Sequence, residues 1–247
     1  MKRYVYHRKR SLLLHFAVCL IMLSPCTNLM ASGSMVSKTQ PPCDNGGLTI
    51  RSIDTIGNEL QSTYLKEVSL DVLSLENGKV GEILDKFSVW NWTIKEAELP
   101  DNMNALTTFK DGKVTTMLNR GSLGKATKLS VARTIIHELI HAYLSLHFQY
   151  ESRIATVNYP GMMKAWLACK KPDLNKVQHE EIKRSFITEI ATALMEYDQV
   201  SGSKPDDDSV YFDLSWGGLD FAGHHTLTKN DKRRIQKRLM AEQFASY

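Results

Sequence analysis

The feature that most constrains the fold is a His-Glu-x-x-His sequence, residues 137–141, within a long and mainly apolar segment. On an α-helix His137 and His141 would project from one face, one turn apart. Thr127 or Ser130 can cap the start of such a helix. Apolar residues recur through the segment at helical spacing: Leu129, Ala132, Ile136, Ile140 and Tyr143. We therefore predict a helix that brings the two imidazoles to one point.

Two imidazole nitrogens one turn apart can bind a single zinc ion at ~2.0–2.1 Å. Glu138 lies about 100° further around the helix, beside such an ion rather than on it. A carboxylate there can accept a proton from water whose pKa the metal lowers toward ~7. The pattern predicts His137 and His141 as zinc ligands and Glu138 as the general base. The alternative interpretation is a pair of hydrogen-bonded core histidines.

A third ligand is needed, and His147 follows His141 at the spacing of the longer motif H-E-x-x-H-x-x-G-x-x-H. That motif needs a glycine to break the helix, and Leu144 stands in its place. In an unbroken helix His147 would lie ~9 Å further along the axis than His141 and ~120° around it. His147 is therefore a poor candidate.

His179 is the preferred third ligand. It lies at the expected start of a second helix, residues 179–199, whose apolar positions predict inward packing: Ile182, Phe186, Ile190, Ala193 and Leu194. A carboxylate ligand from Glu180 or Glu189 is the alternative.

The His-Glu-x-x-His motif is typical of zincins, and the remaining patterns indicate an α+β fold; we therefore expect a zincin-like fold in which a small antiparallel sheet packs on the motif helix and further helices. Asp111-Gly112 between two β-like runs predicts a two-residue hairpin. Residues 89–94 form another β-like run, and we expect strand 114–118 at the sheet edge, where extended substrate can pair with it. Helical periodicity covers 53–87, with a break at Asn77-Gly78, and 229–244. Residues 215–219 form either a loop lining the cleft or a tight turn held by Trp216.

The first 31 residues have the features of a secretory signal. Cationic residues 2–10 precede an apolar run, 12–23, which is too short to span a bilayer, since a span needs ~20 residues. We expect cleavage near 25–32, a linker at 32–47 and one zincin-like domain at 48–247. A lipid anchor at Cys26 is the competing prediction. Cys43 and Cys169 could form a disulfide or stay free.

The charge distribution argues against a nucleic-acid partner. The chain carries a net charge of +4, but residues 1–31 hold five basic and no acidic residues, which leaves 26 basic and 27 acidic residues elsewhere. Basic residues at 229–238 are interleaved with Ile235 and Leu239 and predict an amphipathic surface helix with a solvated cationic face. Hydrophobic residues make up 43% and charged residues 23%, which excludes a fibrous or disordered chain.

Three segments together, 132–144, 178–181 and 215–219, resemble the SprT-like group of zinc metallopeptidases, and most closely the uncharacterised exported bacterial members. The likeness extends over about residues 87–240. It implies a zincin fold, zinc bound by His137, His141 and His179, and Glu138 as the catalytic acid and base. The zinc ribbon of some members is absent, and their role on DNA–protein crosslinks does not fit an exported chain.

The sequence therefore predicts an exported zinc metallopeptidase, periplasmic, envelope-bound or secreted, which acts on peptides or proteins and has no transmembrane span in its mature form. One alternative is a non-catalytic, zinc-stabilised binding module of the cell envelope. Another is an amidase that acts on cell-wall peptides.

Overall fold

The computed structural model of the chain describes residues 56–87, 90–150, 158–159, 171–201 and 207–243. These residues all belong to one compact unit, 40–247. The predicted signal peptide and linker lie outside the described residues, and so do Cys26, Cys43 and Cys169. Within the described ranges, no helix has both the length and the hydropathy that a bilayer span requires.

The architecture is α+β, with a small mixed sheet of four strands in the order β1-β2-β4-β3. β2 runs parallel to both β1 and β4, whereas β3 and β4 are antiparallel. The prediction of an antiparallel sheet was therefore wrong. The strands are β1 (Gly57–Asn58), β2 (Trp92–Ala97), β3 (Ala105–Lys110) and β4 (Lys113–Asn119).

The predicted hairpin is confirmed, but its place in the sheet differs from the prediction. Asp111 and Gly112 both have positive φ, 52° and 71°, as a type I′ turn requires. The chain leaves β2, passes to the outside of the sheet and enters β3, so that β4 returns beside β2. Residues 114–118 are therefore central, with β2 and β3 on either side, and the prediction that they form the edge was wrong. β3 takes the outer position.

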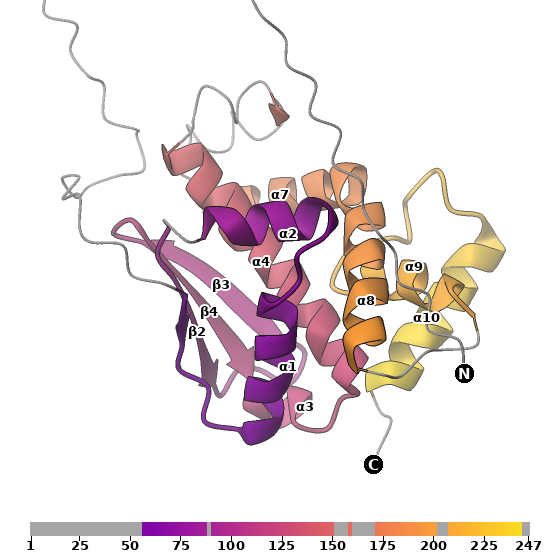
Figure 1. The fold of residues 1–247 in the computed structure, drawn as a ribbon. Coiled ribbons are helices and arrows are strands. Elements are labelled where there is room, and N and C mark those ends of the chain that lie inside the picture. Colours follow the sequence, from indigo (N-terminus) through magenta and orange to yellow (C-terminus); the bar gives the residue numbers. More distant parts are fainter. Residues whose placement is uncertain (1–55, 88–89, 151–157, 160–170, 202–206, 244–247) are drawn as a thin grey trace, which may run out of the picture. The chain divides into compact units, whose positions relative to one another are not determined.

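Eight helices are formed by the described residues (Figure 1). The motif helix is α4, and α7 carries His179. The helices are α1 (Thr63–Leu73), α2 (Gly78–Lys86), α3 (Arg120–Leu123), α4 (Lys128–Tyr150), α7 (Lys171–Ser185), α8 (Ile187–Ser201), α9 (Ser209–Ser215) and α10 (Lys229–Gln243).

Helical periodicity placed some boundaries wrongly. The helix expected from residue 53 begins at Thr63, after β1, because Ser62 caps it and accepts a hydrogen bond from the amide of Leu65. The helix expected at 179–199 begins at Lys171 and is interrupted at Phe186. Backbone hydrogen bonds from Phe186 to Ile182 and from Ile190 to Phe186 still follow the helical pattern, so the interruption is local.

α4 is the central helix of the fold. It contacts β3 and β4 of the sheet as well as α1 and α8 (Figure 1). Every residue from Ser130 to Phe148 is buried, so the helix has no solvated face. Its apolar residues pack into the core, and all but one of its buried polar residues recur at spacings of three and four on one stripe: Ser130, Arg133, Thr134, His137, Glu138, His141 and Ser145. A buried polar stripe on a core helix needs partners or a function.

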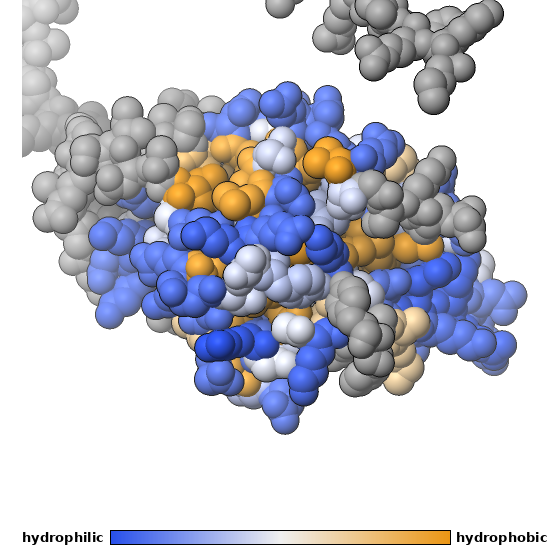
Figure 2. All heavy atoms as spheres, turned by 60° about the horizontal axis from the view of Figure 1, so that its bottom comes forward, coloured by the Kyte–Doolittle hydropathy of each residue, from blue (hydrophilic) through white to orange (hydrophobic). Residues whose placement is uncertain are grey.

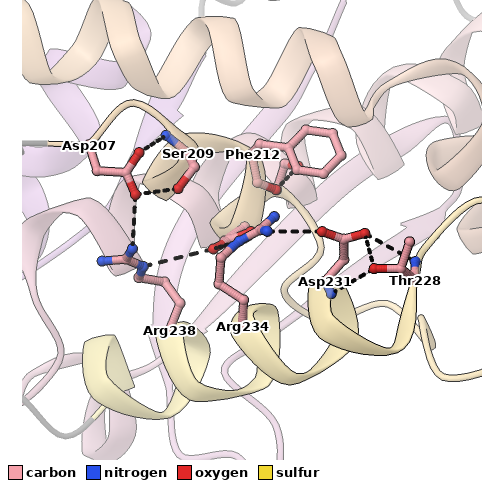
Figure 3. Close-up of polar contacts among 9 residues, drawn as sticks. Asp207, Ser209, Phe212, Thr228, Asp231, Arg234 and Arg238 are labelled. Carbon is pink, nitrogen blue, oxygen red and sulfur yellow. Dashed lines mark hydrogen bonds and ion pairs between the residues drawn. The ribbon is translucent and has the colours of Figure 1, made fainter.

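α10 matches its predicted bounds to within one residue, but its cationic face is partly paired. The Nε–H of Arg234 donates a bifurcated hydrogen bond to both carboxylate oxygens of the fully buried Asp213, at 3.0 and 3.1 Å. Arg234 also pairs with Asp231, and Arg238 lies 3.7 Å from Asp207 (Figure 3). These arginines therefore attach α10 to the segment that contains α9. On the face shown in Figure 2, hydrophobic side chains lie in separate groups among hydrophilic ones.

Candidate metal centre

The fold brings together the three histidines predicted as metal ligands. α4 supplies His137 and His141, and α7 supplies His179. One nitrogen from each ring lies within 4.8 Å of the other two, and the Nε2 atoms of His137 and His141 are 3.1 Å apart. The three side chains are therefore close enough to bind a metal ion.

The donor geometry fits a tetrahedral ion. Bonds of ~2.0–2.1 Å at a tetrahedral angle put two ligand nitrogens roughly 3.3 Å apart, close to the separation of the His137 and His141 nitrogens. The three ligand nitrogens lie within 4.8 Å of one another, and His179 is only partly buried on its helix. Three imidazoles are the donor set of an open metal site, in which the fourth position is left to water or substrate.

His141 is held in one tautomer by neighbours on both helices. Its Nδ1 lies 2.8 Å from Oε1 of Gln178, which can only accept, so Nδ1–H donates and Nε2 keeps its lone pair. Gln178 is itself oriented, because its Nε2 donates to the Ser145 hydroxyl at 3.1 Å. That hydroxyl donates in turn to the backbone carbonyl of His141 at 2.9 Å. Such outer partners orient metal-binding imidazoles in known sites.

The histidines are kept neutral, which is the form that binds metal. Burial lowers the pKa of His141 to about 4, and burial together with the neighbouring His141 lowers the pKa of His179 to about 4. Burial, followed by the charges of His141, His179 and Arg133, lowers the pKa of His137 well below its usual value. No proton has to leave these rings near neutral pH before a cation can bind.

Glu138 lies beside the three histidines and is 8% exposed. Burial raises the pKa of its carboxyl group to about 7, while hydrogen bonding by Thr107 and the charge of Arg133 act in the opposite direction. A carboxyl group with a pKa near 7 is well matched to accept and return a proton at neutral pH.

A chain of hydroxyl groups connects Glu138 to the core of the sheet. Trp92 Nε1 donates to Thr116 Oγ1 at 2.9 Å, and the hydroxyls of Thr116 and Thr107 are 2.7 Å apart. An indole N–H can only donate, and an ionised carboxylate can only accept. The arrangement that satisfies every group has Thr116 donating to Thr107 and Thr107 donating to Glu138.

Arg133 lies on α4 one turn before His137, on the same polar stripe. It is 8% exposed, and its Nε is buried without a hydrogen-bond partner among the described residues. Burial lowers the pKa of its guanidinium to about 10, against the opposing effect of Glu138. The group is still charged at neutral pH.

The segment that follows α9 forms one wall of the site. Trp216 is buried, whereas Gly217 and Gly218 line the cavity, so both interpretations of residues 215–219 hold in part. Gly218 has φ 82° and a Cβ on it would stand 3.5 Å from His137 Cε1. A Cβ on Gly217 would stand 2.7 Å from Arg133 Cζ, so a larger residue there would displace the guanidinium from its present position.

The cavity over these residues has a volume of about 490 Å³, within the range of small-molecule and peptide sites. The connection between β2 and β3, the start of β3 and α10 complete its walls. The wall residues from these parts are Asn102, Met103, Asn104, Ala105, Leu106, Thr107, Gln236, Leu239 and Met240.

The rejected and alternative ligands lie elsewhere. His147 is buried in the core and stacks on Tyr143, with ring centroids 5.0 Å apart and 16° between planes. Glu180 pairs with Lys183, and neither Glu180 nor Glu189 belongs to the histidine cluster. Of the three candidates on α7 and α8, only His179 lies in the histidine cluster. His179 lies in the middle of α7, however, and not at its start.

Sequence reasoning overlooked three residues of this site. Arg133 could have been found, because it lies four residues before His137 and so on the same helical face. Thr107 and Gln178 carry no such signal, since their roles depend on how β3 and α7 pack against α4.

Comparison with known proteins finds no match: no family model, no curated protein and no solved structure is significantly similar to the chain.

Proposed function

We propose that the protein is an exported, zincin-like zinc peptidase of SprT-like type. The observation that carries the proposal is the arrangement of His137, His141 and His179 around one point in an open cavity, with the carboxyl group of Glu138 beside them. This donor set suits zinc, and a zinc ion bound there would polarise a peptide carbonyl and lower the pKa of water to ~7.

The chain's own residues supply the rest of the chemistry. Glu138 accepts a proton from the attacking water and returns it to the departing amine, so the carboxyl group ends each cycle as it began. Thr107 holds the carboxylate by donating to it, and Gln178 keeps Nε2 of His141 free to bind the cation.

A non-catalytic binding module is the less well supported alternative. A structural zinc site has four protein ligands, and across the residues that can be described no Cys, Asp, Glu or further His joins the three histidines. A structural site also has no need of a buried carboxyl group whose pKa lies near 7. Both observations favour an enzyme.

The Glu138→Gln variant tests the catalytic role, with a quenched fluorescent peptide library as substrate and zinc content measured in parallel. We expect full zinc occupancy and a kcat reduced about 10³-fold, since a positioned general base contributes 10²–10⁴-fold. Glu189→Gln is the matched control, because this carboxylate on α8 does not line the cavity, and it should keep wild-type activity. Wild-type rates in Glu138→Gln would rule out the mechanism.

The amidase alternative concerns the substrate rather than the site. Linear peptides and cell-wall stem peptides, offered to the zinc-loaded protein under the same conditions, separate the two activities. The proposal expects turnover of the linear peptides, and hydrolysis confined to cell-wall amide bonds would favour the amidase.

A further inference from the structure

We infer that Arg133 binds a carboxylate of the substrate, so that the cavity selects peptides with a negative charge near the scissile bond. The inference rests on the proposed function and extends it to the class of substrate. It comes from a buried cation in the wall of the cavity that has no hydrogen-bond or ion-pair partner among the described residues.

The charge of Glu138 acts on Arg133, but no hydrogen bond or ion pair joins Arg133 to a described residue. The side chain is 8% exposed, and its Nε is buried without a hydrogen-bond partner. Arg133 takes part in none of the ion pairs found among the described residues. A buried charge is costly unless it is paired, and buried arginines therefore normally have a partner.

The cavity around Arg133 carries little negative charge. Of the wall residues that the structure describes, Glu138 is the only carboxylate and Arg133 the only arginine or lysine. Most other polar wall residues are neutral amides and hydroxyls. A divalent cation on the histidines would add positive charge, and the field inside the cavity would then favour an anion.

The wall opposite the guanidinium is shaped to accommodate it. Gly217 approaches so closely that a Cβ there would stand 2.7–2.9 Å from Cζ, Nε and Nη1 of Arg133. The guanidinium is thus held between α4 and the turn after α9, one helical turn from His137. A guanidinium fixed in this way presents paired N–H groups, which match the two oxygens of a carboxylate.

The carboxylate can come from two sources, the C-terminus of a peptide or the side chain of Asp or Glu. Two peptide pairs separate them. Both peptides of the first pair lack acidic residues, and one ends in a free carboxylate whereas the other ends in an amide. Both peptides of the second pair have an amidated C-terminus, and one has Glu next to the scissile bond whereas the other has Gln.

In at least one of the two pairs, the wild-type protein should cleave the peptide with the carboxylate with a kcat/KM at least about 30-fold above that of the neutral peptide. A difference of this size is expected because the neutral peptide leaves a buried charge without its partner. The difference should lie mainly in KM. Arg133→Gln should abolish the preference while zinc content and circular dichroism stay unchanged, and Arg133→Lys should keep part of it. Equal kcat/KM for both members of both pairs in the wild type overturns the inference, even if Arg133→Gln does not fold.

Equilibrium binding distinguishes this inference from the proposed function. Fluorescence anisotropy of the same labelled peptides on zinc-loaded Glu138→Gln reports affinity without hydrolysis. Tighter binding of an acid peptide, lost on adding Arg133→Gln, supports the carboxylate site even if the protein cleaves no peptide. Cleavage without any acid preference in binding or rate leaves the peptidase standing and removes the role of Arg133.

Discussion

Thr107 links the sheet to the carboxyl group of Glu138 by hydrogen bonds. Its hydroxyl lies between Thr116 and Glu138, and Trp92 fixes the far end of the chain by donating to Thr116. Because each donor has one acceptor in this arrangement, the Glu138 carboxylate has a preferred orientation before substrate binds. That orientation is what a general base requires.

Thr107→Val removes the hydroxyl and keeps the shape of the side chain. We expect kcat to fall about 10-fold with KM and zinc content unchanged, because the carboxylate loses the hydroxyl donor and keeps only the backbone hydrogen bond of Thr107. Thr108→Val is the matched control, since Thr108 is the exposed neighbour of Thr107 on β3 and its hydroxyl donates to the backbone carbonyl of Thr115 on β4. Steady-state kinetics with one peptide substrate measures both. Equal kcat in the two variants would contradict the role given to Thr107.

The residues predicted from sequence are those whose geometry is set within one helix. His137, Glu138 and His141 follow from a spacing of one and four residues, and the structure brings them to one cavity. The prediction of His179 needed a further step, the inference from its apolar positions that its helix packs inward. Thr107 and Gln178 could not be predicted, because a hydrogen bond across elements depends on their packing and not on local spacing.

At the scale of elements, the turn after α9 and helix α10 together form one side of the cavity. Gly217 and Gly218 come from the turn, and Gln236, Leu239 and Met240 come from α10. Asp213, the fully buried acid on α9, joins the two by accepting from Arg234. This buried carboxylate is therefore one of the contacts that position the wall, beside the Arg238–Asp207 pair.

Asp213→Asn should lower the free energy of unfolding by about 1–3 kcal/mol, because it weakens hydrogen bonds to a charged group and leaves a buried polar atom unsatisfied. Glu82→Gln is the control, since it breaks the exposed Lys79–Glu82 pair and should cost less than ~0.5 kcal/mol. Urea denaturation of both variants gives the two values. Equal losses would show that the buried carboxylate has no special effect.

Local signals predicted elements better than their assembly. The Asp111-Gly112 turn and the ends of α10 follow from residues next to one another, and both predictions agree with the structure. The order of the strands depends on where the hairpin docks beside β2, which no local pattern encodes. The same limit applies to the start of α1, where Ser62 and the β1 strand override the apolar periodicity.

At the scale of the molecule, the candidate site joins segments far apart in the chain. α4 provides two histidines and α7 the third, and their contact also passes through Gln178 and Ser145. A metal ion bound by both helices would stabilise their packing, because it binds the folded state and not the unfolded one. Metal binding should therefore depend on α7 as much as on α4.

Isothermal titration calorimetry of the metal-free protein with zinc tests most directly the central claim, that His137, His141 and His179 bind the ion. We predict one equivalent bound with sub-micromolar affinity by the wild type, and affinity at least about 100-fold weaker in His179→Ala. His225→Ala, which removes an exposed histidine outside the cluster, should bind as the wild type does. No zinc binding by the wild type, or unchanged affinity in a folded His179→Ala, would contradict the account.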